Sequence, residues 1–216
     1  MERGDSPRLV SLAQRLLNKA CEENRHREAE IMQGIDGEKE HAECVLSWVE
    51  KLSPNPSPAL KIAALFHDID RIVTPHLGGG FKGDRRSKEY YEHKKAHAKR
   101  SADYVCPKLL TCGVNPQIVE RIGFLISHHD DIGEEVNELN DDELNILVAA
   151  DSFAFFTSIA PELYQKEGED RLRDKIRFMV EKMPSFAKDL LASHKVENKF
   201  FDRIKNEIIA ELGRPN

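Results

Sequence analysis

Five histidines and two aspartates recur along the chain in an order that suits the binding of metal ions. Imidazole and carboxylate groups are ligands of Fe, Mn, Ni, Co and Zn ions, whereas Mg prefers more oxygen ligands and water. A divalent ion held by such groups activates water and neutralises charge on phosphoryl oxygens. We therefore expect a centre that binds one or two divalent transition-metal ions. Its candidate ligands are His41, His67, Asp68, His97, His128, His129 and Asp151.

Several of these residues occur among apolar residues that repeat at helical spacing. His41 shares a predicted helix stripe with Val45 and Trp48, and Asp151 follows Leu147 on another. Burying an imidazole or a carboxylate on an apolar face is costly unless something binds it. A lone histidine in such a place is more often a hydrogen-bonded core residue, so the metal hypothesis depends on agreement among several helices.

A positively charged stretch surrounds His97. It holds eight basic and three acidic residues, although the whole chain has a net charge of −6. The overall charge argues against nucleic acid as a partner, and the local cations favour a small anion over the alternative of a solvated helix face. The basic residues are Lys82, Arg85, Arg86, Lys88, Lys94, Lys95, Lys99 and Arg100, and the acidic ones are Asp84, Glu89 and Glu92.

Length and composition indicate one globular domain. The chain has 216 residues, of which 40% are hydrophobic and 32% charged. No apolar run approaches the roughly 20 residues that span a bilayer, and the N-terminal sequence lacks the apolar core of a secretory signal. We therefore expect no membrane association and a cytoplasmic location. The four cysteines form no CxxC pair, which argues against a zinc-thiolate site or a disulfide framework.

The elements that must position these ligands are helices, since helical spacing recurs in almost every segment and no sustained β alternation appears. We predict an all-α fold, a compact helical bundle in which residues 1–216 form one domain. The motif-bearing core covers about residues 36–157. We expect the amphipathic helices over residues 161–213 to buttress that core.

Local signals set several helix boundaries. Ser57-Pro58, Asn115-Pro116 and Asn140-Asp141-Asp142 each combine capping residues with a helix start. The segment ALKIAALFHDIDRI is apolar on most sides, which predicts a central buried helix ending in the His-Asp doublet. The glycine-rich TPHLGGGFKGDRR predicts a loop. A helix is expected after this loop, and Pro107 should kink or end that helix.

The order His, His-Asp, His, His-His, Asp resembles the HD superfamily of metal-dependent phosphohydrolases. The resemblance runs from about His41 to Phe156, and its most specific pieces are HAECVLSWVEKL, ALFHDIDRI, HAKRSADYV followed by ERIGFLISHHD, and VAADSF. It favours His97 over His93, four residues earlier, because the Ala-Lys-Arg-Ser-Ala stretch after His97 resembles that of the family.

The resemblance implies an HD-type helical domain with two ion positions. The first would use His41, His67, Asp68 and Asp151, and the second would use Asp68, His97, His128 and, as a further candidate, His129. Arg71 stands where many family members carry a lysine, and it could bind phosphate in its place. The absence of a Gly-Tyr-Pro signature disfavours cyclic dinucleotides, and the absence of a synthetase domain disfavours a complete alarmone-metabolising enzyme.

The leading hypothesis is hydrolysis of a phosphoester in a nucleotide-like or other small phosphorylated metabolite by metal-activated water. Asp68 would bridge the ions or orient the nucleophile. Asp70 and Asp131 are candidates for general acid or base, with solvated carboxylates as the alternative. The candidate phosphate-binding residues are Arg71, Lys94, Lys95 and Lys99, with Arg85 and Arg86 reaching in from the loop.

Two other classes of function remain open. The same ligand order occurs in mixed-valent di-iron oxygenases of the inositol oxygenase branch, which would require two irons. A metal-bound domain without catalysis could instead sense an anion or a partner protein. Under any of these hypotheses the helical C-terminal region could also pair two copies as a homodimer.

Overall fold

The computed structural model describes residues 6–31, 33–78, 81, 83, 87–131 and 140–213. Within these ranges the regular secondary structure is helical and no strand occurs, which confirms the all-α prediction. The α-helices are α1 (Ser6–Glu23), α2 (Gly34–Leu52), α3 (Pro58–Phe66), α4 (Asp70–Val73), α5 (Pro75–Gly78), α6 (Lys88–Thr111), α7 (Pro116–His128), α9 (Asp142–Ser158), α10 (Ala160–Lys182), α11 (Ser185–Ser193) and α12 (Lys199–Leu212), with the 3-10 helix η1 (Arg25–Glu30).

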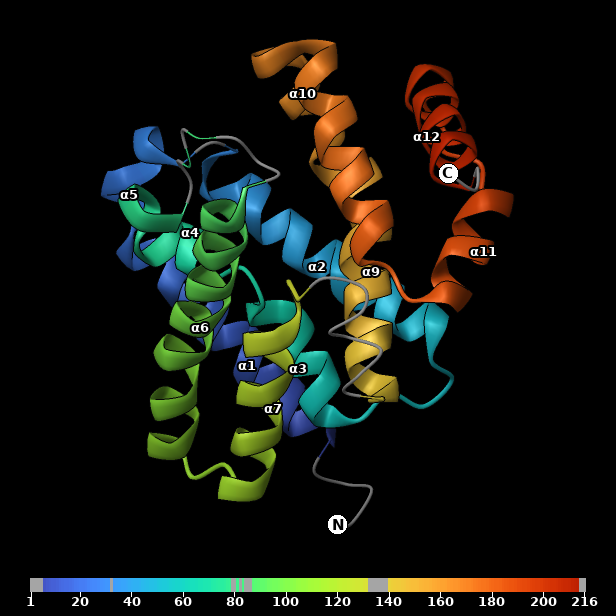
Figure 1. Ribbon diagram of the computed structural model, residues 1–216. Coiled ribbons are helices and arrows are strands. Elements are labelled where there is room, and N and C mark those ends of the chain that lie inside the picture. Colours follow the sequence, from blue (N-terminus) through green and yellow to red (C-terminus); the bar gives the residue numbers. More distant parts are fainter. Residues whose placement is uncertain are drawn as a thin grey trace.

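Two groups of buried apolar side chains form the interior, and α9 contributes to both. Helices α1, α2, α3, α6 and α7 pack around the first group, and α10, α11 and α12 pack around the second. Figure 1 shows α6 and α7 on one side of α9 and α11 and α12 on the other. Leu147 and Ala150 of α9 belong to the first group, whereas Phe153 and Phe156 belong to the second. Helix α9 therefore joins the two halves of the molecule.

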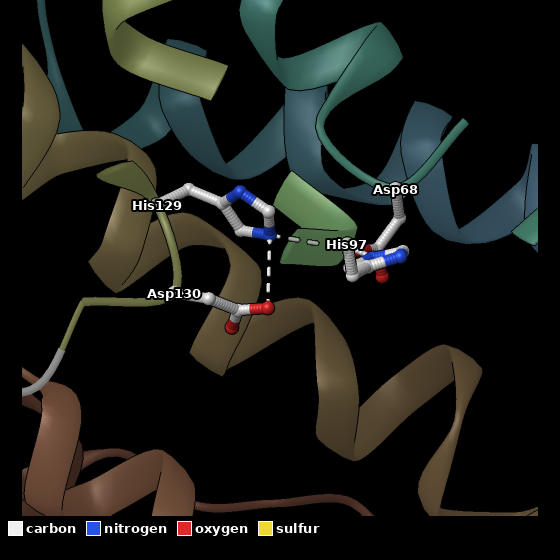
Figure 2. A group of neighbouring side chains, drawn as sticks. All are labelled: Asp68, His97, His129 and Asp130. Carbon is white, nitrogen blue, oxygen red and sulfur yellow. Dashed lines mark hydrogen bonds and ion pairs between the residues drawn. The ribbon is translucent and has the colours of Figure 1, made fainter. Parts of the chain in front are cut away.

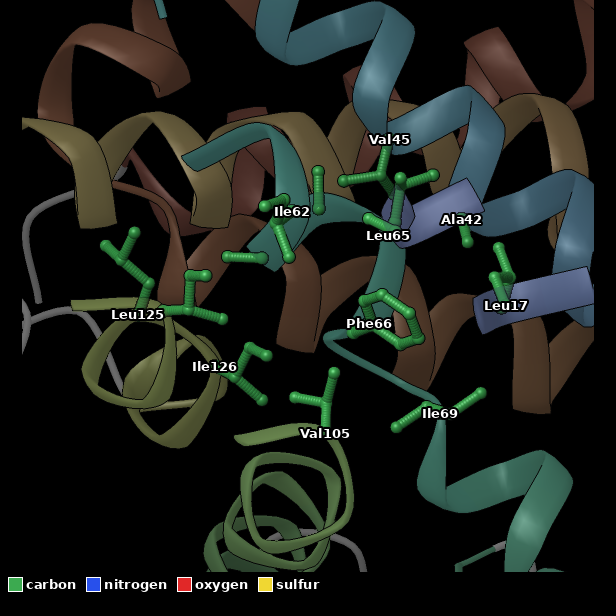
Figure 3. Packing of buried hydrophobic residues seen from close by; sticks show 14 of the residues in the cluster. Leu17, Ala42, Val45, Ile62, Leu65, Phe66, Ile69, Val105, Leu125 and Ile126 are labelled. Carbon is green, nitrogen blue, oxygen red and sulfur yellow. The ribbon is translucent and has the colours of Figure 1, made fainter. Parts of the chain in front are cut away.

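Helix α3 lies at the centre of the first group, as its apolar sequence predicts. Ser57 caps it by accepting a hydrogen bond from the backbone N–H of Leu60 at 3.1 Å. Figure 3 shows Ile62, Leu65 and Phe66 packed among apolar side chains of the neighbouring helices. This burial on all sides holds the end of the helix, and the His-Asp doublet after it, in the interior.

The chain departs from the predicted single helix directly after Phe66. A turn at residues 67–69 separates α3 from α4, and the backbone N–H of Ile69 bonds to the carbonyl of Phe66 at 3.2 Å. Consecutive residues of a regular helix point about 100° apart. In this turn His67 and Asp68 are both buried, with exposures of 0% and 9%. Ending α3 here allows both members of the doublet to face one site.

Helix α6 does not end at Pro107, in contrast to the prediction. It continues for another turn to Thr111, and its neighbours Val105 and Leu109 are buried in the first apolar group. A proline removes one backbone hydrogen bond. Since Pro107 lies near the end of α6, the packing of the helix compensates for that loss. Of the two predicted effects of Pro107, a kink or an end of the helix, the end is wrong.

The other predicted helix starts are confirmed. Asn115 accepts a hydrogen bond from the backbone of Gln117 at 2.8 Å, and Asp141 accepts one from Leu144 at 2.9 Å. In the glycine-rich segment, residues 75–78 form the short helix α5. Lys82, Asp84, Arg85 and Arg86 lie outside the described residues. No single described helix combines the length and apolar composition of a membrane span, although the bent pair of α9 and α10 meets that test together.

Candidate metal centre

Four segments of the chain converge on one buried polar cluster. His41 comes from α2, His67 and Asp68 from the turn after α3, His97 from α6 and Asp151 from α9. Each of these side chains is at most 9% exposed. Helix packing therefore brings together residues that are up to 110 positions apart in the sequence.

The first ligand group consists of His41, His67, Asp68 and Asp151. The Nε2 atom of His41 lies 3.1 Å from Oδ1 of Asp151 and 3.3 Å from Nε2 of His67. The same His67 atom lies 3.6 Å from Oδ1 of Asp151 and 3.7 Å from Oδ2 of Asp68. Nε2 of His67 thus lies within 4 Å of the His41 nitrogen and of one oxygen from each of the two carboxylates.

The second ligand group consists of Asp68, His97, His129 and Asp130, and Figure 2 shows how these side chains point toward one another. Oδ1 of Asp68 lies 2.6 Å from Nε2 of His97 and 3.4 Å from Nε2 of His129. The latter atom also lies 3.4 Å from Oδ2 of Asp130. One potential ligand atom from each residue lies within 4.8 Å of the others. Asp68 therefore contributes one oxygen to each group.

The outer ring nitrogens of three histidines are held by other groups. Nδ1 of His67 donates to the carbonyl of Ala64 at 2.9 Å, and Nδ1 of His129 donates to that of Ile126 at 2.7 Å. Histidines that bind metals usually donate their second ring N–H in this way. Nδ1 of His41 lies 2.8 Å from the hydroxyl of Ser158. These contacts direct each Nε2 into the cluster.

The donor set fits a divalent metal ion. Nε2 of His129 is buried and forms no hydrogen bond within the described part of the chain, although two carboxylate oxygens lie 3.4 Å away. This spacing is characteristic of ligands arranged around an ion rather than of a bonded pair. Imidazole nitrogen and carboxylate oxygen together suit first-row transition metals.

A family model for a domain of unknown function, DUF4202, matches residues 13–204. The chain belongs to the DUF4202 family. The match extends from α1 into α12, so it includes every residue of the cluster. No curated protein matches the chain, and no solved structure does.

The DUF4202 fold does not bring His128 into the cluster. Its side chain is 37% exposed, and its Nδ1 atom lies 2.6 Å from Oδ2 of Asp131. His128 ends α7, and the next residue, His129, points in a different direction because helical neighbours are rotated by about 100°. Of the two predicted histidines, His129 therefore occupies the inward position. We therefore correct the prediction that His128 is a ligand. His97, rather than His93, lies in the cluster.

Two cluster residues of this DUF4202 domain are absent from the sequence prediction, Asp130 and Lys182. Lys182 is fully buried at the end of α10, and its Nζ lies 3.0 Å from Oδ1 of Asp130 and 2.5 Å from Oδ2 of Asp151. Asp130 follows the His-His doublet directly, so its position offered a signal. Lys182 had none, because it occupies an ordinary amphipathic helix. Helix α10 thus contributes to the centre in addition to packing beneath it.

The predicted phosphate-binding residues divide into two pairs. Arg71 contacts Oδ2 of Asp68 through Nη2 at 2.8 Å, and the buried ammonium of Lys94 pairs with Asp130. Lys95 and Lys99 are exposed on another face of α6, where Lys99 pairs with Asp103. The structure therefore places Arg71 and Lys94 beside the cluster and Lys95 and Lys99 away from it. This division follows from helical spacing, since Lys94 lies three residues before His97.

The two candidate acid or base residues, Asp70 and Asp131, both form hydrogen bonds or ion pairs with other side chains. Asp70 is buried, and its carboxylate accepts from Nδ1 of His97 at 2.9 Å and from Nη2 of Arg100 at 2.7 Å. Asp131 pairs with His128. Asp70 is thus placed to orient His97, as a carboxylate behind a metal-binding histidine does.

The cluster carboxyls stay ionised although they are buried. Burial opposes ionisation of Asp68, but Arg71 and the neighbouring histidines outweigh it and hold the pKa of this carboxyl well below its usual value. Burial is likewise outweighed by Lys94 and Lys182 at Asp130 and by Lys182 at Asp151, so both pKa values are lowered. Three carboxylates are therefore available as anionic ligands at neutral pH.

The two carboxylates beside His129 favour the protonated form of its imidazole. Burial lowers its pKa, but the charges of Asp130 and Asp68 outweigh burial and raise the pKa to about 9. An ion bound by Nε2 of His129 would have to displace this proton. The proton and the ion are therefore alternative occupants of the second ligand group.

Proposed function

We propose that the chain is a metal-dependent phosphohydrolase that cleaves a phosphoester of a small phosphorylated metabolite. The observation that supports this best is the position of Asp68, whose two oxygens face two different histidine and carboxylate groups. The order of these ligands resembles that of the HD superfamily. Two cations, Arg71 and Lys94, flank the same cluster, which favours an anionic substrate.

One or two bound divalent ions would supply Lewis-acid polarisation of the phosphoryl oxygens and would activate the attacking water. Asp68 would fix the spacing between the two ligand groups. Asp70 would hold the His97 ring in place through its 2.9 Å contact with Nδ1. The buried position of all these groups excludes bulk water from the reacting phosphate.

Arg71 is suited to hold the phosphate. Its Nη2 is bound to Asp68, while its buried Nε forms no hydrogen bond with the described residues. A guanidinium can donate from several N–H groups in one plane, which matches two oxygens of a phosphate. The substrate would thus be held by the same side chain that orients Asp68.

The decisive experiment combines metal analysis with a phosphoester screen on Asp68→Ala. Because Asp68 serves both ligand groups, this variant should lose bound metal and phosphate release together, whereas Asp103→Ala, an exposed position on α6, should keep both. Elemental analysis of protein purified without added metal or chelator gives the ion content, and inorganic phosphate release gives the activity. Full metal content in Asp68→Ala would contradict the assignment.

The screen also separates the other two hypotheses. Two irons per chain with dioxygen uptake and no phosphate release would establish an oxygenase instead. Saturating metal without turnover of any phosphoester, together with tight binding of an unchanged anion, would establish a sensing domain. We favour hydrolysis over both because Arg71 and Lys94 contact the ligand carboxylates themselves.

A further inference from the structure

A small cavity adjoins the metal centre on the side of α10. Its volume is about 90 Å³, and five of the described residues that line it are charged side chains at most about one-sixth exposed. Arg71 and Lys94 line the cavity and also contact Asp68 and Asp130. The cavity therefore opens beside the second ligand group. Its charged lining residues closest to the centre are Glu38, Arg71, Lys94 and Lys175.

Lys175 is the unusual member of this wall. It is 7% exposed, and among the described residues it forms no ion pair; its contact is with the ring of Phe178, 4.9 Å from Nζ to the ring centroid. Burial and then the charge of Lys94 lower the pKa of its amino group well below the usual value. Without a counter-charge, burial therefore disfavours the ammonium form of this side chain. An anion in the cavity would supply that counter-charge.

Glu38 is an acidic residue that lines the same cavity. Its carboxyl is 5% exposed, and its Oε2 atom forms no hydrogen bond with the described residues. A buried acceptor without a donor loses the free energy of its hydration, and a ligand hydroxyl would restore it. The cavity thus offers cations for a phosphate and a separate acceptor for a hydroxyl group.

The size of the cavity limits the ligand. Pockets for larger organic ligands measure roughly 300–1,000 Å³, several times the 90 Å³ enclosed here. Tyr90, Ile159 and Leu163 provide apolar walls that would contact a short carbon chain. A nucleobase with its ribose exceeds this space, whereas an alcohol of a few carbon atoms fits it.

On the basis of the phosphohydrolase function proposed above, we propose that the substrate is the phosphomonoester of a small polyol or sugar. Lys175, with Arg71 and Lys94, binds the phosphate, and Glu38 accepts a hydrogen bond from a hydroxyl of the leaving alcohol. Water adds to phosphorus, the bond from phosphorus to the ester oxygen breaks, that oxygen takes up a proton, and inorganic phosphate and the free polyol leave. The small volume of the cavity favours such an ester over a nucleotide.

Three esters test the substrate class with the metal-loaded full chain: glycerol 3-phosphate, propyl phosphate and AMP. Propyl phosphate has the same carbon chain as glycerol phosphate without its hydroxyl groups. We expect kcat/KM to be highest for glycerol 3-phosphate, lower by about tenfold or more for propyl phosphate, and lowest for AMP. Cleavage of AMP at least as efficient as that of glycerol 3-phosphate would overturn the proposal.

Two variants test the residues. Lys175→Met should raise KM for glycerol 3-phosphate by about ten- to a hundredfold with the metal content unchanged, whereas Lys199→Met, an exposed lysine on α12, should leave KM unchanged. Glu38→Leu should bring the rates for glycerol and propyl phosphates close together, and Glu38→Gln repeats the test if the leucine variant does not fold. An unaltered KM in Lys175→Met, or an unaltered preference in a folded Glu38 variant, would contradict the roles assigned to them.

Equilibrium binding separates this inference from the proposed function. If metal-loaded protein releases phosphate from no ester, hydrolysis is wrong, and calorimetric titration with glycerol 3-phosphate and AMP then tests the cavity alone. Tighter binding of glycerol 3-phosphate that Lys175→Met weakens would support the cavity proposal. Equal or tighter binding of AMP, or no effect of Lys175→Met, would refute it.

Discussion

Lys182 supplies the positive charge that offsets carboxylates of both ligand groups when no metal is bound. Its ammonium is the buried cation that touches both Asp130 and Asp151. Removing one partner of a buried ion pair costs about 3–5 kcal/mol, because the other charge stays buried alone. The stability of the cluster and its affinity for metal should therefore be linked through this side chain.

We predict that Lys182→Met loses about 3–5 kcal/mol of unfolding free energy in chelator and regains much of that loss with saturating Mn²⁺. The regained stability arises because a bound ion neutralises the same carboxylates. Chemical denaturation with and without metal measures both values. Lys205→Met is the matched control, since Lys205 is equally buried but pairs with Asp202, remote from the centre. The unfolding free energy that Lys205→Met loses should be the same with and without metal. Equal metal dependence in both variants would contradict the prediction.

Glu38 should make the protein less stable as the pH rises. Burial raises the pKa of this carboxyl from its ordinary value of 4.5 to about 7. The folded state therefore binds more protons than the unfolded state between these values, so unfolding free energy falls as pH increases through that window. We predict that metal-free Glu38→Gln gains about 3 kcal/mol over the wild type between pH 4.5 and 7.5.

Denaturation curves at several pH values measure this difference. Glu40→Gln, which replaces an exposed glutamate on α2, should differ from the wild type by an amount that does not vary with pH. A Glu38→Gln difference that stays constant over the same range would show that Glu38 ionises normally.

At the residue scale, the sequence predicted most of the cluster but not Asp130, Lys175 or Lys182. His41, His67 and Asp151 could be found because each interrupts an apolar pattern, whereas Asp68, His97 and His129 could be found from the order of the ligands along the chain. The doublet at residues 128–129 could not be resolved, since which member faces inward depends on the residue at which α7 ends. Lys182 and Lys175 were missed because lysine on an amphipathic helix normally faces water, and only the packing of α10 buries them.

At the scale of elements, α10 is the helix whose shape matters most for the site. Gly168 interrupts it with φ 84° and ψ −175°, a conformation that is open almost only to glycine. The part of the helix after this break carries Arg171, Lys175 and Lys182, which line the cavity or bind the cluster. The break therefore sets the direction from which these cations approach.

We predict that Gly168→Ala lowers the unfolding free energy by about 1–3 kcal/mol and raises KM for the substrate. Backbone strain is the cause, because the space around the position of an added Cβ is open. Thermal unfolding and steady-state kinetics measure the two effects. Gln165→Ala, an exposed helical position on the same helix, should change neither. Unchanged stability in Gly168→Ala would mean that the helix can straighten without cost.

Helix starts were predictable, whereas interior breaks were not. Ser57, Asn115 and Asp141 cap helices through side-chain hydrogen bonds that depend on local sequence alone. The end of α3 at Phe66 and the continuation of α6 through Pro107 depend instead on which neighbours pack against these helices. Local patterns do not contain that information.

At the scale of the whole molecule, α9 connects the two apolar groups. It supplies buried residues to both groups and also carries the candidate ligand Asp151. Neither group can lose its packing without exposing part of α9. A metal ion bound through Asp151 should therefore stabilise the entire fold rather than one half.

We predict a single thermal transition that saturating Mn²⁺ shifts upward by about 5–10 °C when the ion is present at a hundred times its dissociation constant. Circular dichroism reports all helices, and the fluorescence of Trp48, which stacks on Phe153 of α9 at 4.6 Å between ring centroids, reports the junction. The two signals should coincide with and without metal. Separate transitions would show that the two apolar groups unfold independently.

The position of Lys182 bears on the order in which the protein folds and binds metal. Small zinc domains need their ion in order to fold, because their hydrophobic core is too small and metal binding supplies the missing free energy. Here the chain carries its own internal counter-ion, which is in place as soon as α10 docks. Folding and metal loading then become separate steps. Maturation would end with the capture of an ion by a finished scaffold, so the supply of metal, rather than the yield of folding, would set the active fraction.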